Sequence, residues 1–247
     1  EPEFNMYMYT LRDQFYADKM VEKALEDSKI AHPDIATETV MILTIWMEIV
    51  HLMHKTLQAC KEKKLHDDSG VHSMDAAVAY WIGDGQIAGD SENGHLLYAL
   101  SVRFGEAFDI DYGGQSRTNT NILRLFNKAK NEVSLPNACS ENQTTYKKLR
   151  GIVNRLISLM VIPLIQGLIT SLRANDKARV NIYAHAFVPI VAGCSRTLFN
   201  SLNEKLLLQT INVVEVEYVI DLIRQTYDCL GLMCDDIGVH ELSLIHI

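Results

Sequence analysis

The sequence predicts an all-α fold, a multi-helix bundle, and two observations support this. Apolar residues recur at helical spacing along most of the chain, and no stretch shows the sustained alternation of a half-buried strand. Residues 149–172 carry apolar side chains on nearly every helical face, so a helix here must be covered on most sides. Pro163 removes one backbone donor about halfway along, which predicts a kink. We expect a central kinked helix at 149–172, buried at Ile157, Met160, Leu164 and Leu168.

A membrane span is the competing interpretation of the same stretch. Its uninterrupted apolar part is shorter than the roughly 20 residues that a bilayer requires. Polar residues such as Asn154, Arg155 and Gln166 interrupt it further. We therefore expect a buried helix and no membrane span.

Start and stop signals place the other helices. His32-Pro33 ends a helix that begins near Asn5, and Asp34 can cap a long helix that reaches about Lys63. Glycines terminate several of the later helices because they accept the left-handed conformation after a last turn. These helices are predicted over 73–82, 95–104, 119–132, 177–202 with an interruption at Pro189, and from the capping box 212–215 to Gly231.

The chain is expected to form a single helical domain over 5–240. A faint internal duplication lies within it, because a long apolar helix is followed by an alanine-rich one in both halves. Ala76–Gly83 and Ala186–Gly193 are the matching stretches. They predict two pseudo-repeated halves, 34–133 and 143–238, that bury their apolar helices against each other.

Composition excludes some classes of protein. The 247 residues are 48% hydrophobic and 22% charged, as in ordinary globular proteins. The formal net charge is −8, and the longest basic run is Lys61–Lys64. A nucleic-acid binder would carry a basic stripe that neutralises phosphates. No nucleic-acid partner is therefore expected.

The cysteines favour an oxidising compartment. They lack the spacing of a zinc site, and Asn142-Gln-Thr144 is a candidate N-glycosylation acceptor. Together they favour a secreted protein with at most two internal disulfides, an N-glycan and one leftover thiol. The alternative is a cytosolic protein with buried free cysteines. The disulfide candidates are Cys60, Cys139, Cys194, Cys229 and Cys234; at least one bond is expected to involve Cys229 or Cys234.

Both ends of the sequence look unnatural. Glu1-Pro-Glu-Phe4 lacks an initiator methionine and a signal peptide, so the true N-terminus is expected upstream or already removed. The tail over 241–247 includes Leu242-Ser-Leu-Ile-His-Ile247, which resembles translated sequencing-adapter read-through. We expect the tail to be non-native and leave it out of the fold prediction.

Several blocks between about Trp46 and Gly238 resemble a family of uncharacterised secreted helical proteins abundant in diatoms and related algae. The matching blocks are Asp75-Ala-Ala-Val-Ala-Tyr80, Leu97-Tyr-Ala-Leu100, Ile162-Pro-Leu-Ile-Gln-Gly167, Val188-Pro-Ile-Val191 and Cys229-Leu-Gly-Leu-Met-Cys-Asp-Asp-Ile-Gly238. The resemblance implies an extracellular helical domain, sometimes repeated within one chain, without an assigned activity. The family typically has a cysteine soon after the Leu-Tyr-Ala-Leu block, where this chain has Phe104. The resemblance therefore does not establish that this chain forms the disulfide of that family cysteine.

Metal chemistry has two weak candidates. Glu48-Ile-Val-His51 has the Glu-x-x-His spacing of di-iron bundles, but both residues fall on one strip with Thr44 and Lys55, away from the apolar rows. We therefore predict that Glu48 and His51 are surface residues. The second candidate is an oxygen-rich loop region that suits calcium but lacks the EF-hand order: His66, Asp67, Asp68, His72, Asp84, Asp90 and Glu92.

No recognisable catalytic constellation appears in the sequence. Gly-x-Ser-x-Gly, P-loop, Rossmann and His-Glu-x-x-His patterns are absent. His185 is interpreted as a packed histidine, and Asp235-Asp236 as a solvated pair at a helix end. The favoured function is a non-catalytic extracellular structural or interaction domain, with protein partners or self-association and no cofactor. The alternatives are an iron-handling or calcium-binding helical bundle, and an enzyme whose site is scattered over several helices.

Overall fold

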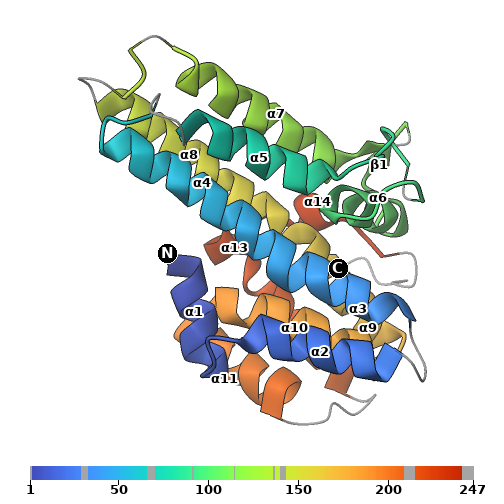
Figure 1. The fold of residues 1–247 in the computed structure, drawn as a ribbon. Coiled ribbons are helices and arrows are strands. Elements are labelled where there is room, and N and C mark those ends of the chain that lie inside the picture. Colours follow the sequence, from blue (N-terminus) through green and yellow to red (C-terminus); the bar gives the residue numbers. More distant parts are fainter. Residues whose placement is uncertain are drawn as a thin grey trace. The chain divides into compact units, whose positions relative to one another are not determined.

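The computed structural model describes residues 2–28, 33–65, 70–90, 92–113, 115–135, 137–139, 143–208 and 215–240. Helices make up nearly all of the regular structure in these ranges (Figure 1). The exception is a hairpin of two short antiparallel strands, β1 (Asp111–Tyr112) and β2 (Gln115–Ser116). The prediction of an all-α, multi-helix protein is confirmed.

The chain forms two compact units. Unit 1 contains residues 1–44, 107–109 and 161–247, and unit 2 contains residues 45–106 and 110–160. The boundaries of these units differ from those of the two pseudo-repeated halves, 34–133 and 143–238, that the sequence predicted. The internal duplication remains a prediction.

Four long helices enclose the core of unit 2: α4 (Trp46–Lys61), α5 (Gly70–Ile82), α7 (Arg117–Val133) and α8 (Gln143–Met160). In sequence order each packs against the next, and α8 packs back against α4, which closes a four-helix arrangement (Figure 1). Trp81, Met53 and Ile122 are among its fully buried side chains. α6 (Leu97–Ala107) and the β1–β2 hairpin complete the unit.

Buried polar groups in this unit find specific partners. The Trp81 indole Nε1 donates to Asn119 Oδ1 over 3.0 Å, and Asn119 Nδ2 donates to the Tyr98 carbonyl oxygen over 3.0 Å. The Thr56 hydroxyl donates to the Gly70 carbonyl oxygen over 2.8 Å. Such bonds fix the register of α5, α6 and α7, because an unpaired polar group in the interior is costly.

In unit 1, α10 (Lys177–Ala192) packs against α9 (Ile162–Arg173), α1 (Pro2–Leu11), α11 (Arg196–Asn203) and α3 (Pro33–Thr39). It is buried on most sides, including at Tyr183, Phe187 and Val191. The other elements are α2 (Tyr16–Ser28), η2 (Glu204–Leu208), α12 (Val216–Arg224), α13 (Tyr227–Leu230) and α14 (Cys234–Ile237).

The N-terminal region departs from the single helix predicted over 5–28. α1 ends at Leu11, and Arg12 has a left-handed φ of 54°. Asp13 Oδ1 accepts a hydrogen bond from the Phe15 amide over 2.9 Å, just before α2 begins. A short acidic side chain that binds the next backbone amides favours a turn over a continuing helix. The prediction of one helix was wrong for this reason.

The second predicted helix is present as a continuous helical run. It begins at Pro33, which places Asp34 in the first turn instead of at the cap. α3 is followed by a π-helical segment, η1 (Val40–Ile45), and then by α4. The amino-acid pattern did not reveal η1, because π-helical segments are rare and appear mostly as single turns inside α-helices.

The stretch 149–172 consists of the end of α8 and nearly all of α9, separated at Val161. Pro163 lies in the first turn of α9, where its missing amide hydrogen leaves no helical bond unmade. The four residues expected to be buried, Ile157, Met160, Leu164 and Leu168, are at most 9% exposed. The predicted burial is confirmed. Pro163 was predicted to kink one helix, and the structure instead divides the stretch into two helices at Val161, two residues before it.

Proline acts differently in α10. Pro189 lies inside the helix, which continues to Ala192, so the predicted interruption at this position was wrong. Packing on several sides holds the helix across the missing hydrogen bond. The chain instead turns at Gly193 to Ser195 before α11, which divides the predicted helix 177–202. At the C-terminal end Gly231 has a left-handed φ of 70° after α13, as predicted. The capping box 212–215 lies mostly outside the described residues.

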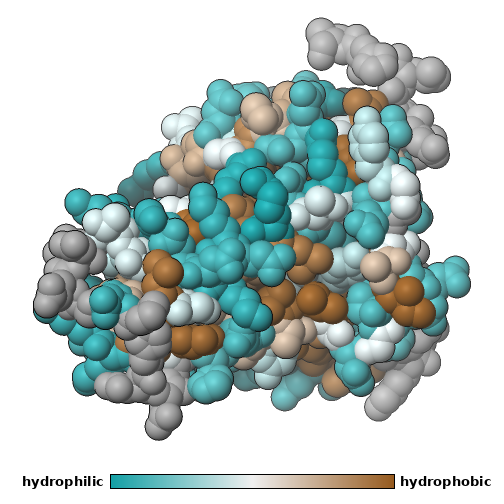
Figure 2. Space-filling view, turned by 90° about the horizontal axis from the view of Figure 1, so that it is seen from above, coloured by the Kyte–Doolittle hydropathy of each residue, from teal (hydrophilic) through white to brown (hydrophobic). Residues whose placement is uncertain are grey.

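Two helical segments, Asp34–Lys61 and Thr144–Arg173, are long and apolar enough to cross a bilayer by length and composition alone. In the structure, 61% of the most apolar 18-residue stretch of the first segment is buried, and 78% of that of the second. A mostly buried core helix of a soluble protein can have the same length and hydropathy as a membrane span. These two segments are therefore weak evidence for a membrane. The face in Figure 2 carries clusters of hydrophobic side chains between hydrophilic ones.

Candidate functional site

The Glu48/His51 pair lies at the surface of α4. His51 is exposed and Glu48 is half-buried, and Thr44 and Lys55 on the same strip are exposed. Trp46, Ile49 and Met53 point into the interior, and none of them is measurably exposed. A di-iron bundle needs its ligands to point inward. The pair therefore lacks the placement that such a site requires.

The oxygen-rich loop is organised around Asp90. Its Oδ1 accepts from the backbone amides of Glu92 over 2.7 Å and Asn93 over 3.1 Å, and its Oδ2 accepts from the Asn93 side chain. These bonds, led by the Asn93 side chain, lower the pKa of the Asp90 carboxyl. They use the carboxylate to shape a turn. Residues 66–68 lie outside the described residues, and Asp84 and Glu92 are exposed.

The first disulfide joins Cys60 to Cys139, with the two Cα atoms 5.1 Å apart. It links the last turn of α4 to the connection between α7 and α8, all within unit 2. Cys139 has a left-handed φ of 64°, a conformation that a turn tolerates more readily than a helix. The bond closes a loop across most of the four-helix arrangement.

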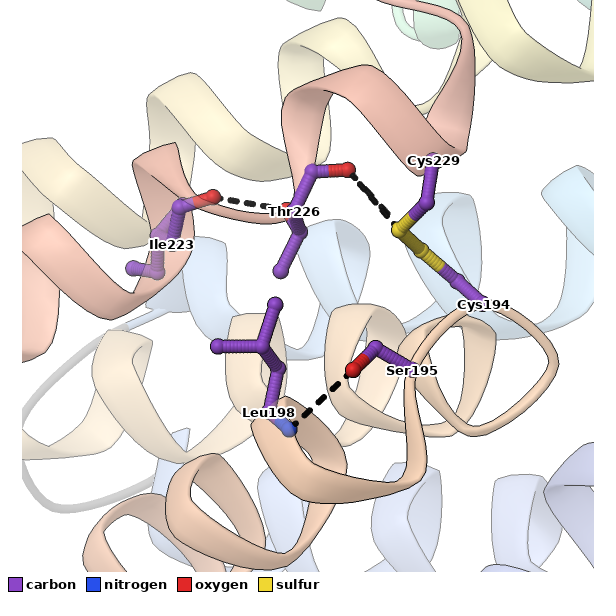
Figure 3. Close-up of a disulfide and its surroundings, with 6 residues drawn as sticks. All are labelled: Cys194, Ser195, Leu198, Ile223, Thr226 and Cys229. Carbon is purple, nitrogen blue, oxygen red and sulfur yellow. Dashed lines mark hydrogen bonds between the residues drawn. A yellow bond between two sulfur atoms is a disulfide. The ribbon is translucent and has the colours of Figure 1, made fainter.

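The second disulfide joins Cys194 to Cys229, with Cα atoms 5.5 Å apart, and lies within unit 1 (Figure 3). It connects the turn after α10 to α13. The carbonyl oxygen of Thr226 lies 3.2 Å from Cys229 Sγ, and the Thr226 hydroxyl donates to the Ile223 carbonyl oxygen over 2.6 Å. Cys234 is exposed and is the free cysteine of the chain. Two disulfides, one of them at Cys229, and one leftover thiol agree with the sequence prediction.

His185 and the acidic pair after Cys234 have structural roles. His185 is half-buried, and its Nδ1 lies 2.7 Å from the Asn181 carbonyl oxygen one helical turn earlier. Burial lowers the pKa of its imidazole. Asp235 is exposed, but Asp236 is buried and its Oδ2 accepts from the Met233 amide over 3.0 Å at the start of α14. Asp236 therefore does not belong to a solvated pair.

Two polar groups that the sequence did not single out lie in the interior. In unit 1, Glu38 is 4% exposed, and its carboxylate accepts from Arg179 Nε over 3.0 Å. Arg179 Nη1 also donates to Asp176 Oδ2 over 3.0 Å, while Asp176 Oδ1 caps α10 by accepting from the Arg179 amide. No local pattern marks Glu38, because its partner lies 141 residues away.

The second group lies at the start of α7 in unit 2. Buried atoms of Asp111, Arg117 and Thr118 have no hydrogen-bond partner there. Short polar residues beside a glycine turn are common in sequences, so the pattern alone did not reveal this group.

Within the described ranges, no three His, Cys, Asp or Glu side chains are grouped so as to hold a metal ion. Comparison with known proteins finds no family model, curated protein or solved structure that matches this chain. The sites that stand out are therefore the two cross-links with their neighbouring thiol, and the polar group at the start of α7.

Proposed function

We propose that this chain is a non-catalytic extracellular domain with a structural or interaction role in a larger assembly. The observation that carries the proposal is the pair of disulfides, each of which cross-links one helical unit. Disulfides persist in oxidising compartments and are rare in the reducing cytosol. The resemblance to secreted algal proteins supports the same localisation.

Exposed apolar side chains support an interaction role. Tyr9 is 75% exposed on α1, Tyr112 is 85% exposed on the β1–β2 hairpin, and Leu208 is 73% exposed at the end of η2. Tyrosine is enriched at protein interfaces because it combines a large apolar ring with a polar tip. An exposed thiol left over in a disulfide-bearing chain also suits a bond to another chain, and Cys234 is such a thiol.

Localisation is tested on the native protein. Source cells are separated into culture medium, cell-surface and intracellular fractions, with free thiols alkylated at the moment of lysis. We expect the protein outside the cell, and peptide mapping without reduction should give the Cys60–Cys139 and Cys194–Cys229 pairs and a glycan on Asn142. Intracellular protein with five alkylated cysteines would refute the extracellular assignment.

The assembly role is tested by measuring the mass of the native protein with size-exclusion chromatography and light scattering. We expect a particle larger than the 27.9 kDa chain. Repeating the measurement with Cys234→Ser separates covalent from non-covalent assembly. A native protein that runs as a monomer, with no cross-linked neighbour after surface cross-linking in its own medium, would contradict the proposed role.

A further inference from the structure

The start of α7 is a helix N-terminus without a side-chain cap. α7 has 17 residues, and its N-cap residue, Ser116, makes no capping hydrogen bond. The Ser116 hydroxyl is instead 3.1 Å from the Ser101 hydroxyl, and both side chains are buried. The first turn contains no acidic residue. Its amide hydrogens therefore carry the positive end of the helix dipole with no anionic side chain in that turn to offset it.

Thr118 adds a buried hydroxyl to this turn. The residue is 3% exposed, and its Oγ1 is buried and has no hydrogen-bond partner. In contrast, the hydroxyls of Thr120 and Thr39 donate to the carbonyl oxygens four residues earlier. The Cα–Cβ bonds of a helix tilt toward its N-terminus, and this tilt directs the Thr118 side chain toward the start of α7.

Arg117 adds a positive charge where the helix dipole is already positive. Its backbone amide donates to the Ile110 carbonyl oxygen over 2.9 Å, which fixes the residue at the end of the hairpin. Its Nη2 is buried without a partner, and no carboxylate in the described ranges forms an ion pair with it. A guanidinium nitrogen that is buried at the positive end of a helix raises the free energy of the folded state unless an anion binds to it.

Asp111 is the remaining member of the group. It lies opposite Ser116, the residue before Arg117, in the β1–β2 register, and its Oδ1 is also buried without a partner. A carboxylate oxygen accepts hydrogen bonds only. A ligand that satisfies all three side chains must therefore accept hydrogen bonds from Arg117 and Thr118 and donate one to Asp111.

We propose that the start of α7 binds inorganic phosphate. The oxygens of a phosphate accept from amides, hydroxyl and guanidinium at a helix N-terminus. Near neutral pH the free ion also carries a proton, which can be donated to Asp111. Sulfate has the same shape but no proton at that pH, so the site should prefer phosphate over sulfate.

The test uses the full chain and measures binding by calorimetry at constant ionic strength. We expect saturable binding of inorganic phosphate, weaker binding of sulfate and none of chloride. Arg117→Gln should weaken phosphate binding by about tenfold or more, the range for one charged hydrogen bond. Arg124→Gln is the matched control, because Arg124 is exposed on the same helix and should leave binding unchanged.

Two further arms sharpen the assignment. Asp111→Asn should reduce the preference for phosphate over sulfate, since an amide can donate to either anion. Methyl phosphate has mostly lost its second proton near neutral pH, because the second pKa of a phosphate monoester is about 6. It should therefore bind more weakly than inorganic phosphate, and equally tight binding would contradict the bond to Asp111. If Arg117→Gln does not fold, Thr118→Val gives the same test, because it removes the hydroxyl and keeps the shape.

The proposal is overturned if phosphate and chloride have the same effect, or if Arg124→Gln weakens binding as much as Arg117→Gln. A strong coupling between Arg117→Gln and Asp111→Asn in stability, with no phosphate binding, would also overturn it, because the two side chains would then pair with each other. Amide resonances of Thr118 and Asn119 should shift on phosphate addition; unchanged resonances there would place any binding elsewhere.

Discussion

The indole Nε1 of Trp46 donates a hydrogen bond to the carbonyl oxygen of Met160 over 3.2 Å. Trp46 is the first residue of α4 and Met160 is the last of α8, so the bond joins two helix ends that are 114 residues apart. Neither residue is measurably exposed. Carbonyls in the last turn of a helix lack intrahelical donors. The bond therefore satisfies a buried acceptor at the position where α8 ends.

Replacing Trp46 by Phe should lower the free energy of unfolding by about 1–3 kcal/mol, because a buried carbonyl loses its donor. Urea denaturation followed by circular dichroism measures this. Tyr112→Phe serves as the control, since Tyr112 is 85% exposed and its hydroxyl should contribute little. Equal stability of the two variants would show that the Trp46 bond is unimportant.

Leu164→Ala should destabilise the protein by roughly 2–5 kcal/mol, the range for truncating a packed core leucine. Leu164 in α9 is fully buried. Leu208→Ala provides the comparison, because Leu208 is 73% exposed and the change should stay within about half a kcal/mol. If Leu164→Ala also lowered the free energy of unfolding by less than about half a kcal/mol, α9 would not lie in a packed core.

Removing the two disulfides separately should give unequal losses. In the chain-entropy account, stabilisation grows with the length of the closed loop. The sequence separations are 79 residues for Cys60–Cys139 and 35 for Cys194–Cys229. We expect losses of roughly 4–5 kcal/mol for Cys60→Ala with Cys139→Ala and roughly 3–4 kcal/mol for the other pair, by guanidinium denaturation. The reverse order would contradict the loop-entropy explanation, and Cys234→Ala is the control.

Glu48→Gln combined with His51→Gln should leave the metal content of the purified protein unaltered. Both residues lie on the outer strip of α4, so stability should move by only about half a kcal/mol. Plasma emission spectrometry of the native protein and of this variant measures iron and zinc. A metal that copurifies with the native protein and disappears in the variant would favour the metal-binding alternative.

His185 should make the protein less stable in mild acid. Burial lowers the pKa of its imidazole below the ordinary 6.5, partly offset by the Asn181 carbonyl and reinforced by Lys23. The unfolded chain then binds the proton more readily than the folded one. The contribution of His185 to the free energy of unfolding is fully present above pH 6.5, the ordinary pKa. It is lost as the pH falls from 6.5 to the lowered pKa of the folded state.

His185→Gln should reduce the stability difference between pH 7.5 and pH 5, because glutamine keeps a donor for the Asn181 carbonyl and does not titrate. His95→Gln is the control at an exposed histidine. Melting temperatures across this range provide the measurement. An unchanged pH dependence in His185→Gln would remove His185 as the cause.

Much of the helical pattern follows from local sequence. The apolar rows of α4 predicted which side of the helix is buried, and Glu48 and His51 were correctly placed on the outer strip. Gly83 and Gly231 ended their helices as expected, because both have the left-handed φ that glycine tolerates best. The boundary between α1 and α2 was missed, since the turn at Arg12 depends on hydrogen bonds to the Asp13 side chain.

The sequence by itself determined the all-α class and the buried stretch around Leu164, because hydrophobic periodicity acts over a few residues. Tertiary structure decided which cysteines pair, that α10 continues through Pro189, and that Glu38 lies beside Arg179. It also paired Asp111 with Ser116, the N-cap residue of α7, which makes no capping hydrogen bond. These outcomes depend on partners distant in sequence or on packing from several sides, which no local pattern encodes.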